Sequence, residues 1–147
     1  MNTSAKADAP VADYKLDDQI GFLLRLASQR HAVIFQNTIS ENLTPTQFAT
    51  LMRLAQHGEV SQNHLGRLAA MDIATTKGVV DRLKQKQLLA TKPDPNDKRR
   101  SIISLTETGQ QMIATLQGDG KEISGNTLAE LKPAEQKKLL ELLKKIC

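Results

Sequence analysis

Small polar and basic side chains gather between residues 59 and 106, where their types suit contacts with phosphates and base edges. This segment holds nine lysine and arginine residues against five acidic ones, an excess equal to the +4 formal charge of the whole chain. Such a segment is typical of nucleic-acid binding, although an ordinary solvated surface could carry the same charge. The candidate contacts are Ser61, Gln62, Asn63, Thr75, Thr76, Lys77, Arg82, Lys98, Arg99 and Arg100.

Two short helices joined by a tight turn are expected to position the first part of this set. Ser61 and Asp72 each precede a helical pattern, where a side-chain oxygen can accept the N–H groups that a helix start leaves unpaired. The predicted inward stripes are Leu65, Leu68 and Ala69, then Ile73, Val79, Val80, Leu83 and Leu88. Thr75, Thr76 and Lys77 are left outside. This is the plan of a helix-turn-helix, whose second helix lies in the DNA major groove.

A short antiparallel hairpin is predicted after the second helix. Its flanks are Leu89–Thr91 and Ser101–Leu105, and the turn between them holds two prolines with Asn96 and Asp97. Three consecutive cations, Lys98 to Arg100, follow this turn. A charged hairpin behind a recognition helix is a winged helix. Its tip would reach the phosphates or the minor groove, where the enhanced negative potential favours arginine.

Helices with apolar stripes are predicted on both sides of this lobe. One long helix is expected from Tyr14 to Ile39, and its residues are apolar on two sides. Such a helix needs two packing partners, which are its own lobe and, most simply, a second subunit. Pro133 opens the last helix, whose apolar stripe runs from Leu139 to Ile146. The pattern therefore predicts a DNA-binding lobe joined to a helical dimerisation region.

The remaining helices are marked by their caps. Thr44 begins one of them, with Pro45 at the first helical position and Gln47 completing a capping box. Thr106 begins the helix that follows the hairpin. Glycines interrupt this helix, so we expect a bend or a close helix contact there. These glycines are Gly118, Gly120 and Gly125.

Taken together, these motifs resemble the MarR family of winged-helix transcriptional regulators. Residues 97 to 106, DKRRSIISLT, match the family's wing pattern D-x-R-x-x-x-x-x-L-T at every fixed position. Asp81-Arg82-Leu83, near the end of the recognition helix, also matches. The resemblance covers roughly residues 16 to 146 and includes the order of the helices. The wing pattern is specific because it follows a helix-turn-helix.

The resemblance implies a mainly α fold with a small β wing. Residues 14–147 would form a single domain, with the winged lobe at 44–106 and dimerisation helices at 14–40 and 107–147. Residues 1–13 are expected to be a disordered tail. The resemblance also implies a homodimer that binds a pseudo-palindromic operator of double-stranded DNA, usually as a repressor. Its two recognition helices would then address half-sites about 34–36 Å apart.

Several roles are carried over from the family by position. Arg99 would enter the minor groove, and Asp97 would fix the wing by pairing locally. Thr75–Lys77 would meet base edges or nearby phosphates, while Arg82 would bind a phosphate or brace the wing. Gln62-Asn63 would contact phosphates, although simple helix-start polarity explains this pair equally well.

Many MarR relatives release DNA when a small aromatic acid binds, and the first helices offer candidates for such a site. His31 lies on the inward stripe of the first helix, and an arginine could bind both oxygens of a carboxylate. The tentative effector residues are Arg25, Arg30, His31, Phe35, Phe48, Met52 and Arg53. A buried core histidine, plain core aromatics and surface arginines are the alternative interpretation. The sequence around these helices is most similar to family members that sense aromatic catabolites, which suggests control of a catabolic or efflux operon.

Other classes of protein are less well supported. No catalytic motif is visible, so we expect neither an enzyme nor a cofactor. The three histidines have no i, i+4 pair that would suit a metal, and the single cysteine, Cys147, disfavours a redox switch. No apolar run approaches the ~20 residues that span a bilayer, so a cytoplasmic protein is expected. A regulator without an effector and a protein-docking winged helix remain as alternatives.

Overall fold

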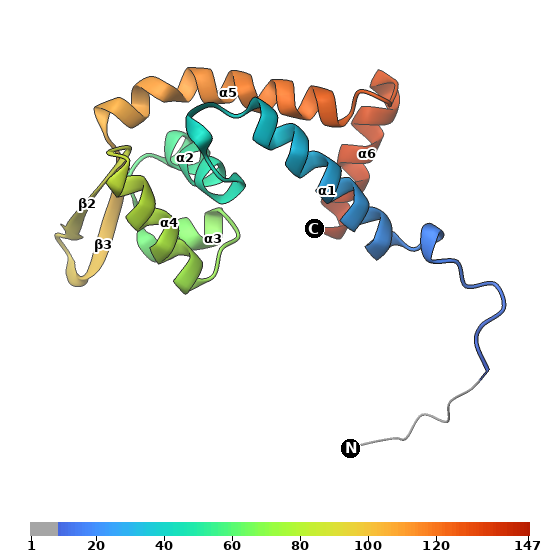
Figure 1. Cartoon of the computed structure of the whole chain (residues 1–147). Helices are drawn as coiled ribbons and strands as arrows, with labels where there is room; N and C mark the ends of the chain where they lie inside the picture. Colours follow the sequence, from blue (N-terminus) through green and yellow to red (C-terminus); the bar gives the residue numbers. More distant parts are fainter. Residues whose placement is uncertain (1–8) are drawn as a thin grey trace, which may run out of the picture.

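The computed structural model describes residues 9–147 and, in that range, contains six α-helices and three short strands (Figure 1). The fold is mainly helical with a small β wing, as predicted. Residues 1–8 of the tail predicted to be disordered lie outside the described residues. Residues 9–13 form neither helix nor strand and are exposed.

Three helices form one side of the molecule. They are α1 (Ile20–Thr38), α5 (Glu107–Thr127) and α6 (Pro133–Ile146). Figure 1 shows α5 along one edge with α1 beneath it, while α6 lies at the end far from the wing. The predicted helix start at Tyr14 is wrong, because a single 3-10 turn, Leu16–Asp18, precedes α1. No helix within the described range is both long and apolar enough to cross a membrane.

The other side of the molecule is the winged lobe. Its helices are α2 (Pro45–His57), α3 (Gln62–Leu68) and α4 (Ile73–Gln85), and its strands are β1 (Val60–Ser61), β2 (Leu89–Asp94) and β3 (Asp97–Leu105). The predicted hairpin of β2 and β3 is present, with Leu89 opposite Leu105. The sequence analysis missed β1, which pairs antiparallel with β3. A two-residue strand is too short to leave an alternating pattern.

The predicted helix caps are all present. Thr44 Oγ1 accepts the Gln47 N–H at 3.2 Å, and Gln47 Oε1 accepts the Thr44 N–H at 3.0 Å, which completes the capping box. Ser61, Asp72 and Thr106 each accept an N–H group at the start of α3, α4 and α5. The three helices of the winged lobe and α5 therefore begin where the sequence indicates.

A single apolar core joins the lobe to α5. Leu65, Leu83, Ile103 and Leu116 are fully buried in it, and they come from α3, α4, β3 and α5. Ile73 was predicted to belong to this core, but its side chain is 78% exposed. The prediction was wrong because the start of α4 extends beyond the elements that cover the rest of the helix.

The glycines of α5 do not interrupt it, since the helix is continuous from Glu107 to Thr127. The alternative expectation, a close helix contact, holds at one of them. A Cβ atom on Gly120 would lie 3.0 Å from Cζ of Phe48 in α2, so α2 and α5 approach closely there. The structure shows no such neighbour within 4 Å of Gly118 or Gly125.

The start of α5 is hydrogen-bonded to the short segment between α4 and β2. The backbone N–H of Thr106 donates to the Leu88 carbonyl at 3.1 Å, and the Thr106 hydroxyl donates to the Gln87 carbonyl at 2.7 Å. One turn later, a Cβ atom on Gly109 would clash with the Leu88 carbonyl oxygen. Only glycine permits this approach, because the obstacle is backbone and cannot move aside as a side chain could.

We expect Gly109→Ala to destabilise the fold by about 1–3 kcal/mol, the usual cost of overpacking. Gly78→Ala is the matched control, because Gly78 is also helical and a Cβ atom there would meet nothing within 4 Å. The control should raise stability by up to about 1 kcal/mol, since alanine is the better helix former. Thermal unfolding measures both changes, and equal melting temperatures for the two variants would contradict this account of the junction.

Candidate nucleic-acid interface

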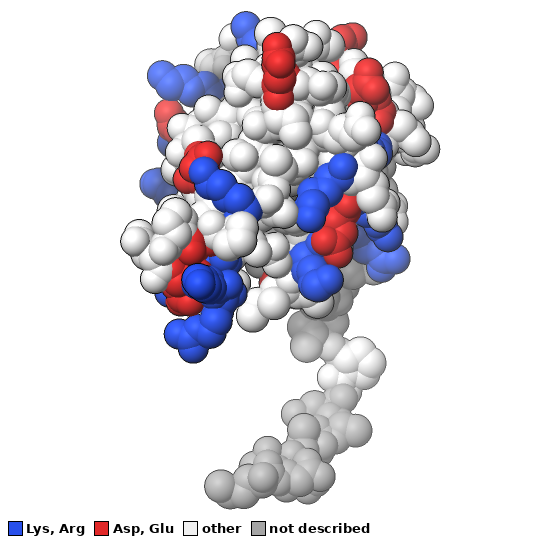
Figure 2. All heavy atoms as spheres, turned by 90° about the vertical axis from the view of Figure 1, so that its left-hand side faces the viewer, with Lys and Arg blue, Asp and Glu red and all other residues white. Residues whose placement is uncertain are grey.

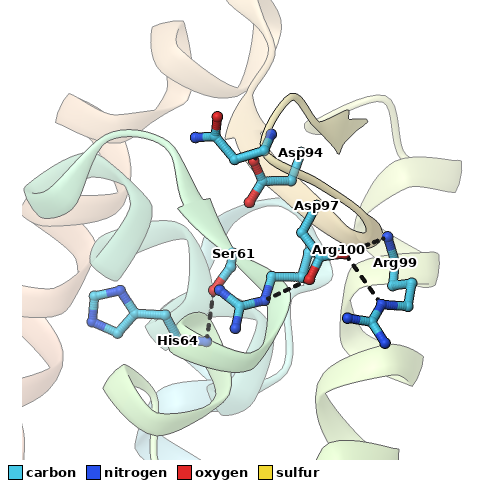
Figure 3. A network of polar contacts seen from close by, with 7 residues as sticks. Ser61, His64, Asp94, Asp97, Arg99 and Arg100 are labelled. Atoms are coloured by element: carbon cyan, nitrogen blue, oxygen red, sulfur yellow. Dashed lines mark hydrogen bonds and ion pairs between the residues drawn. The ribbon is translucent and has the colours of Figure 1, made fainter.

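The start of α3 lies beside the basic strand of the wing. Pairing of β1 with β3 places Ser61 opposite Ile102, two residues after the run of cations that ends at Arg100. Ser61 Oγ also accepts the His64 N–H at 3.2 Å, which fixes the first turn of α3 (Figure 3). The short strand that the sequence analysis missed is therefore the element that brings the two predicted contact segments together.

A small polar notch of about 110 Å³ separates α3 from the wing. Its lining residues are Ser61, Gln62, Asn63, Arg99, Arg100 and Ser101. Figure 3 shows the Arg100 side chain beside Ser61. Hydroxyl and amide donors together with two guanidinium groups suit an anion such as a phosphate. Five of the predicted contact residues thus meet in one place, although they come from segments some 36 residues apart.

Asp97 braces the wing locally, as predicted from its position. Its Oδ1 accepts the Arg99 backbone N–H at 3.0 Å and lies 3.3 Å from Arg99 Nε, while its Oδ2 lies 3.7 Å from Arg100 Nε. The Arg99 side chain is nevertheless 92% exposed. Ion pairs in such an exposed setting contribute little to stability, so an incoming anion could compete for both guanidinium groups.

The exposed surface of α4 carries most of the remaining candidates. Thr75, Lys77 and Arg82 are exposed, and Lys77 forms an i, i+4 ion pair of 3.3 Å with Asp81. Lys98 is exposed on the wing. On the face that includes the wing, Figure 2 shows lysine and arginine side chains in groups on either side of a mostly uncharged strip.

Thr76 does not belong to this exposed surface, and its predicted outward position is wrong. Its side chain is 2% exposed, and its hydroxyl donates to the Asp72 carbonyl at 2.7 Å. A Cβ atom on Gly66 would lie only 2.7 Å from that hydroxyl oxygen. Thr76 therefore packs closely against Gly66 of α3, and its hydroxyl bonds within the first turn of α4.

A second, apolar cavity of about 450 Å³ lies between α1, α5 and α6. His31 lines it, and His31 Nδ1 lies 2.8 Å from Thr127 Oγ1 of α5, within hydrogen-bond distance. The rest of the wall comes largely from small and aliphatic side chains, among them Ala27, Leu128 and Leu143. The α5 and α6 neighbours of His31 could not be predicted from local sequence patterns, because they lie about a hundred residues from His31 in the chain.

The other tentative effector residues lie outside this cavity and have structural contacts. Arg30 donates to the carbonyl groups of Thr127 and Asn126 at 2.7 and 3.2 Å, which caps the end of α5. Arg53 donates to the Leu68 carbonyl at 2.8 Å and to Gln56 Oε1 at 3.0 Å. Phe35, Phe48 and Met52 pack in or against the core, and Arg25 is exposed on α1.

No group of three potential metal ligands comes together within residues 9–147. The nearest approach of two histidines is that of His57 and His64, whose ring centroids are 6.3 Å apart. Two exposed imidazoles form an incomplete ligand set for a structural metal site.

Comparisons with known proteins agree on one family. The MarR family model matches residues 43–101. The transcriptional repressor NicR of Pseudomonas putida is 38% identical over 145 residues, which cover 98% of this chain and 92% of that protein. A probable transcriptional regulator from Pseudomonas aeruginosa superposes with a TM-score of 0.88 at 47% identity, over 90% of this chain and 100% of that one. Bordetella bronchiseptica BpsR, whose DNA binding is regulated by 6-hydroxynicotinic acid, superposes with a TM-score of 0.85 at 38% identity. The match covers 90% of this chain and 96% of that one.

The cap of α4 makes a prediction about pH. Asp72 Oδ1 accepts the Thr75 backbone N–H at 2.7 Å, and this hydrogen bond lowers the pKa of Asp72 below its ordinary value of 3.8. A lowered pKa stabilises the folded state above the unfolded-state pKa, and this stabilisation is lost as the pH falls through the folded-state value. Asp72→Asn keeps a good cap but cannot titrate.

We therefore expect the melting temperature of the unmodified chain to fall more steeply than that of Asp72→Asn between about pH 5 and pH 3. All other carboxylates are shared by the two proteins, so their contributions cancel in the difference. Parallel melting curves across that range would show that the Asp72 carboxylate does not stabilise α4 in this way.

Proposed function

This chain belongs to the MarR family of transcriptional regulators, which are not enzymes, and from that premise we propose that two copies bind a pseudo-palindromic operator as a repressor. The observation that carries the proposal is the notch in which the start of α3 meets Arg99 and Arg100 of the wing. The exposed Thr75 and Lys77 of α4 provide a second set of donors in the same lobe. As a regulator of chromosomal genes, the protein would act in the cytoplasm.

Pairing of two copies is supported by apolar side chains that a single chain leaves exposed. On α1 and α6 these are Ile20, Leu23, Leu24, Leu26, Val33, Leu140, Leu142 and Ile146. None of the α6 residues is buried within the chain. Exposed apolar surface of this extent is typical of an interaction site, and a self-complementary patch gives a two-fold dimer. The two recognition helices would then meet half-sites about 34–36 Å apart.

Within each half-site, the residues divide by the groups that they would contact. Thr75 and Lys77 would meet base edges or neighbouring phosphates, and Arg99 would enter the minor groove. Phosphate contacts would come from the remaining candidate donors, which are exposed or half-buried: Ser61, Gln62, Asn63, Arg82, Lys98 and Arg100. Thr76 would act indirectly, because it is buried where α4 packs against Gly66 of α3.

We also propose that a small aromatic acid releases the operator by binding in the cavity beside His31. A volume of about 450 Å³ falls within the usual range of small-molecule sites. His31 contacts Thr127 and Arg30 caps the same end of α5, so a ligand at His31 would act directly on the α1–α5 contact. DNA binding by BpsR is regulated by 6-hydroxynicotinic acid, which is such a compound.

The DNA-binding proposal is tested with Arg99→Ala. Because the Arg99 side chain is exposed, we expect its loss to weaken binding to operator DNA at least tenfold while the melting temperature and the dimer are unchanged. Lys137→Ala, on the side of α6 away from its leucines, is the control for a loss of charge alone. Electrophoretic mobility shifts measure DNA binding, thermal unfolding measures the melting temperature, and analytical ultracentrifugation measures the dimer. Equal DNA binding by the two variants would argue against the wing contact.

The effector proposal is tested with 6-hydroxynicotinic acid. We expect this acid to raise the melting temperature, because a ligand that binds the folded state stabilises it, and to release bound operator DNA. His31→Ala should abolish both effects, while 2-hydroxypyridine, which lacks the carboxylate, should have a weaker effect. Stabilisation and release that persist in His31→Ala would exclude this cavity as the site.

A further inference from the structure

Ile73 is the most exposed of the large apolar side chains in the described part of the chain, at 78%. It is the first residue of α4 and directly follows the capping Asp72. Single exposed apolar residues are common on protein surfaces. The position of this one is informative, because it stands at the end of the recognition helix where base contacts are made in helix-turn-helix proteins.

Helix geometry explains why Ile73 is exposed. At about 100° per residue, Ile73 lies within about 20° of the buried Val80 around the helix axis, but about 10 Å nearer the N-terminus. The Ile73 side chain therefore points in nearly the same direction as Val80, but it lies closer to the N-terminus of α4 than the part of the helix that the core covers. The start of α4 protrudes from the lobe, and its branched aliphatic side chain protrudes with it.

The surroundings of Ile73 combine apolar and polar groups. A hollow of about 630 Å³ lies between α3 and α4, and Ile73, Ala74 and Met71 supply its apolar wall. Gln62 and Asn63 of α3 line the same hollow, and they also line the notch beside the wing arginines. Figure 1 shows α3 and α4 on the opposite side of the molecule from α6, so a partner copy paired through α6 would leave the hollow open to DNA.

We propose that Ile73 is a specificity-determining residue that contacts the C5-methyl group of a thymine in each half-site. This inference rests on the proposed DNA-binding function. In the major groove, the four standard base pairs present hydrogen-bonding groups and a single apolar group, the thymine methyl. An aliphatic side chain that enters the groove can recognise only that group. The exposed neighbours Ala74 and Gly78 are small, so they would not hold the helix away from the bases.

The test begins with a duplex enriched from a randomised library by the unmodified chain. Each thymine of that duplex is then replaced in turn by deoxyuridine, which removes only the methyl group. At one position in each half-site, we expect affinity to fall about fourfold, the equivalent of one buried methyl group. Ile73→Ser should bind the thymine and deoxyuridine duplexes equally, while Ile73→Val, which keeps a branched side chain, should retain the preference.

Lys77→Ala is the matched control from the next turn of α4. It should weaken binding to the thymine and deoxyuridine duplexes by the same factor, because a cation does not recognise the methyl group.

If a specific duplex is enriched but methyl removal never weakens binding, or weakens it equally in Ile73→Ser, the inference about Ile73 is wrong and the DNA-binding proposal stands. Failure to enrich any sequence would overturn both. Because Ile73 is exposed, the melting temperature of each variant should match that of the unmodified chain.

Discussion

The geometry of the molecule depends on the close backbone contact between the segment that follows α4 and the start of α5. Thr106 hydrogen-bonds to the carbonyl groups of Leu88 and Gln87, and Gly109 allows α5 to lie against Leu88. Both wing strands start or finish beside this junction, at Leu89 and Leu105. Since α1 packs along the same α5, one contact sets the recognition helix, the wing and the proposed dimerisation helices relative to one another.

In the same arrangement, the wing carries the exposed arginines, while the start of α4 carries uncharged side chains. The wing presents exposed arginines held by Asp97, which in the proposed complex would contact phosphates and the minor groove. The start of α4 presents Ile73, Thr75 and the adjoining hollow, which in the proposed complex would meet base edges. At the other end of α5, His31 and Arg30 both contact Thr127. A ligand there would act on the helix that orients the lobe.

The features that the sequence predicted correctly are those set by neighbouring residues. The caps at Thr44, Ser61, Asp72 and Thr106 and the wing pattern each depend on a few consecutive positions. The errors have a different origin. Helical periodicity predicts the direction of a side chain but not where the core ends, so it wrongly assigned Ile73 to the core. It also could not foresee that α3 would approach closely enough to bury Thr76, nor that the neighbours of His31 would come from α5 and α6.

In the proposed complex, α4 and the wing of one lobe contact the same DNA duplex. Since Cys147 is the single cysteine, Cys147→Ser gives a background in which Thr75→Cys or Asn96→Cys can carry a tethered iron–EDTA group. We predict that both tethers cut the DNA within the same half-site, about half a helical turn or roughly five base pairs apart. Cleavage from only one tether, or at sites separated by more than a full turn, would contradict the account.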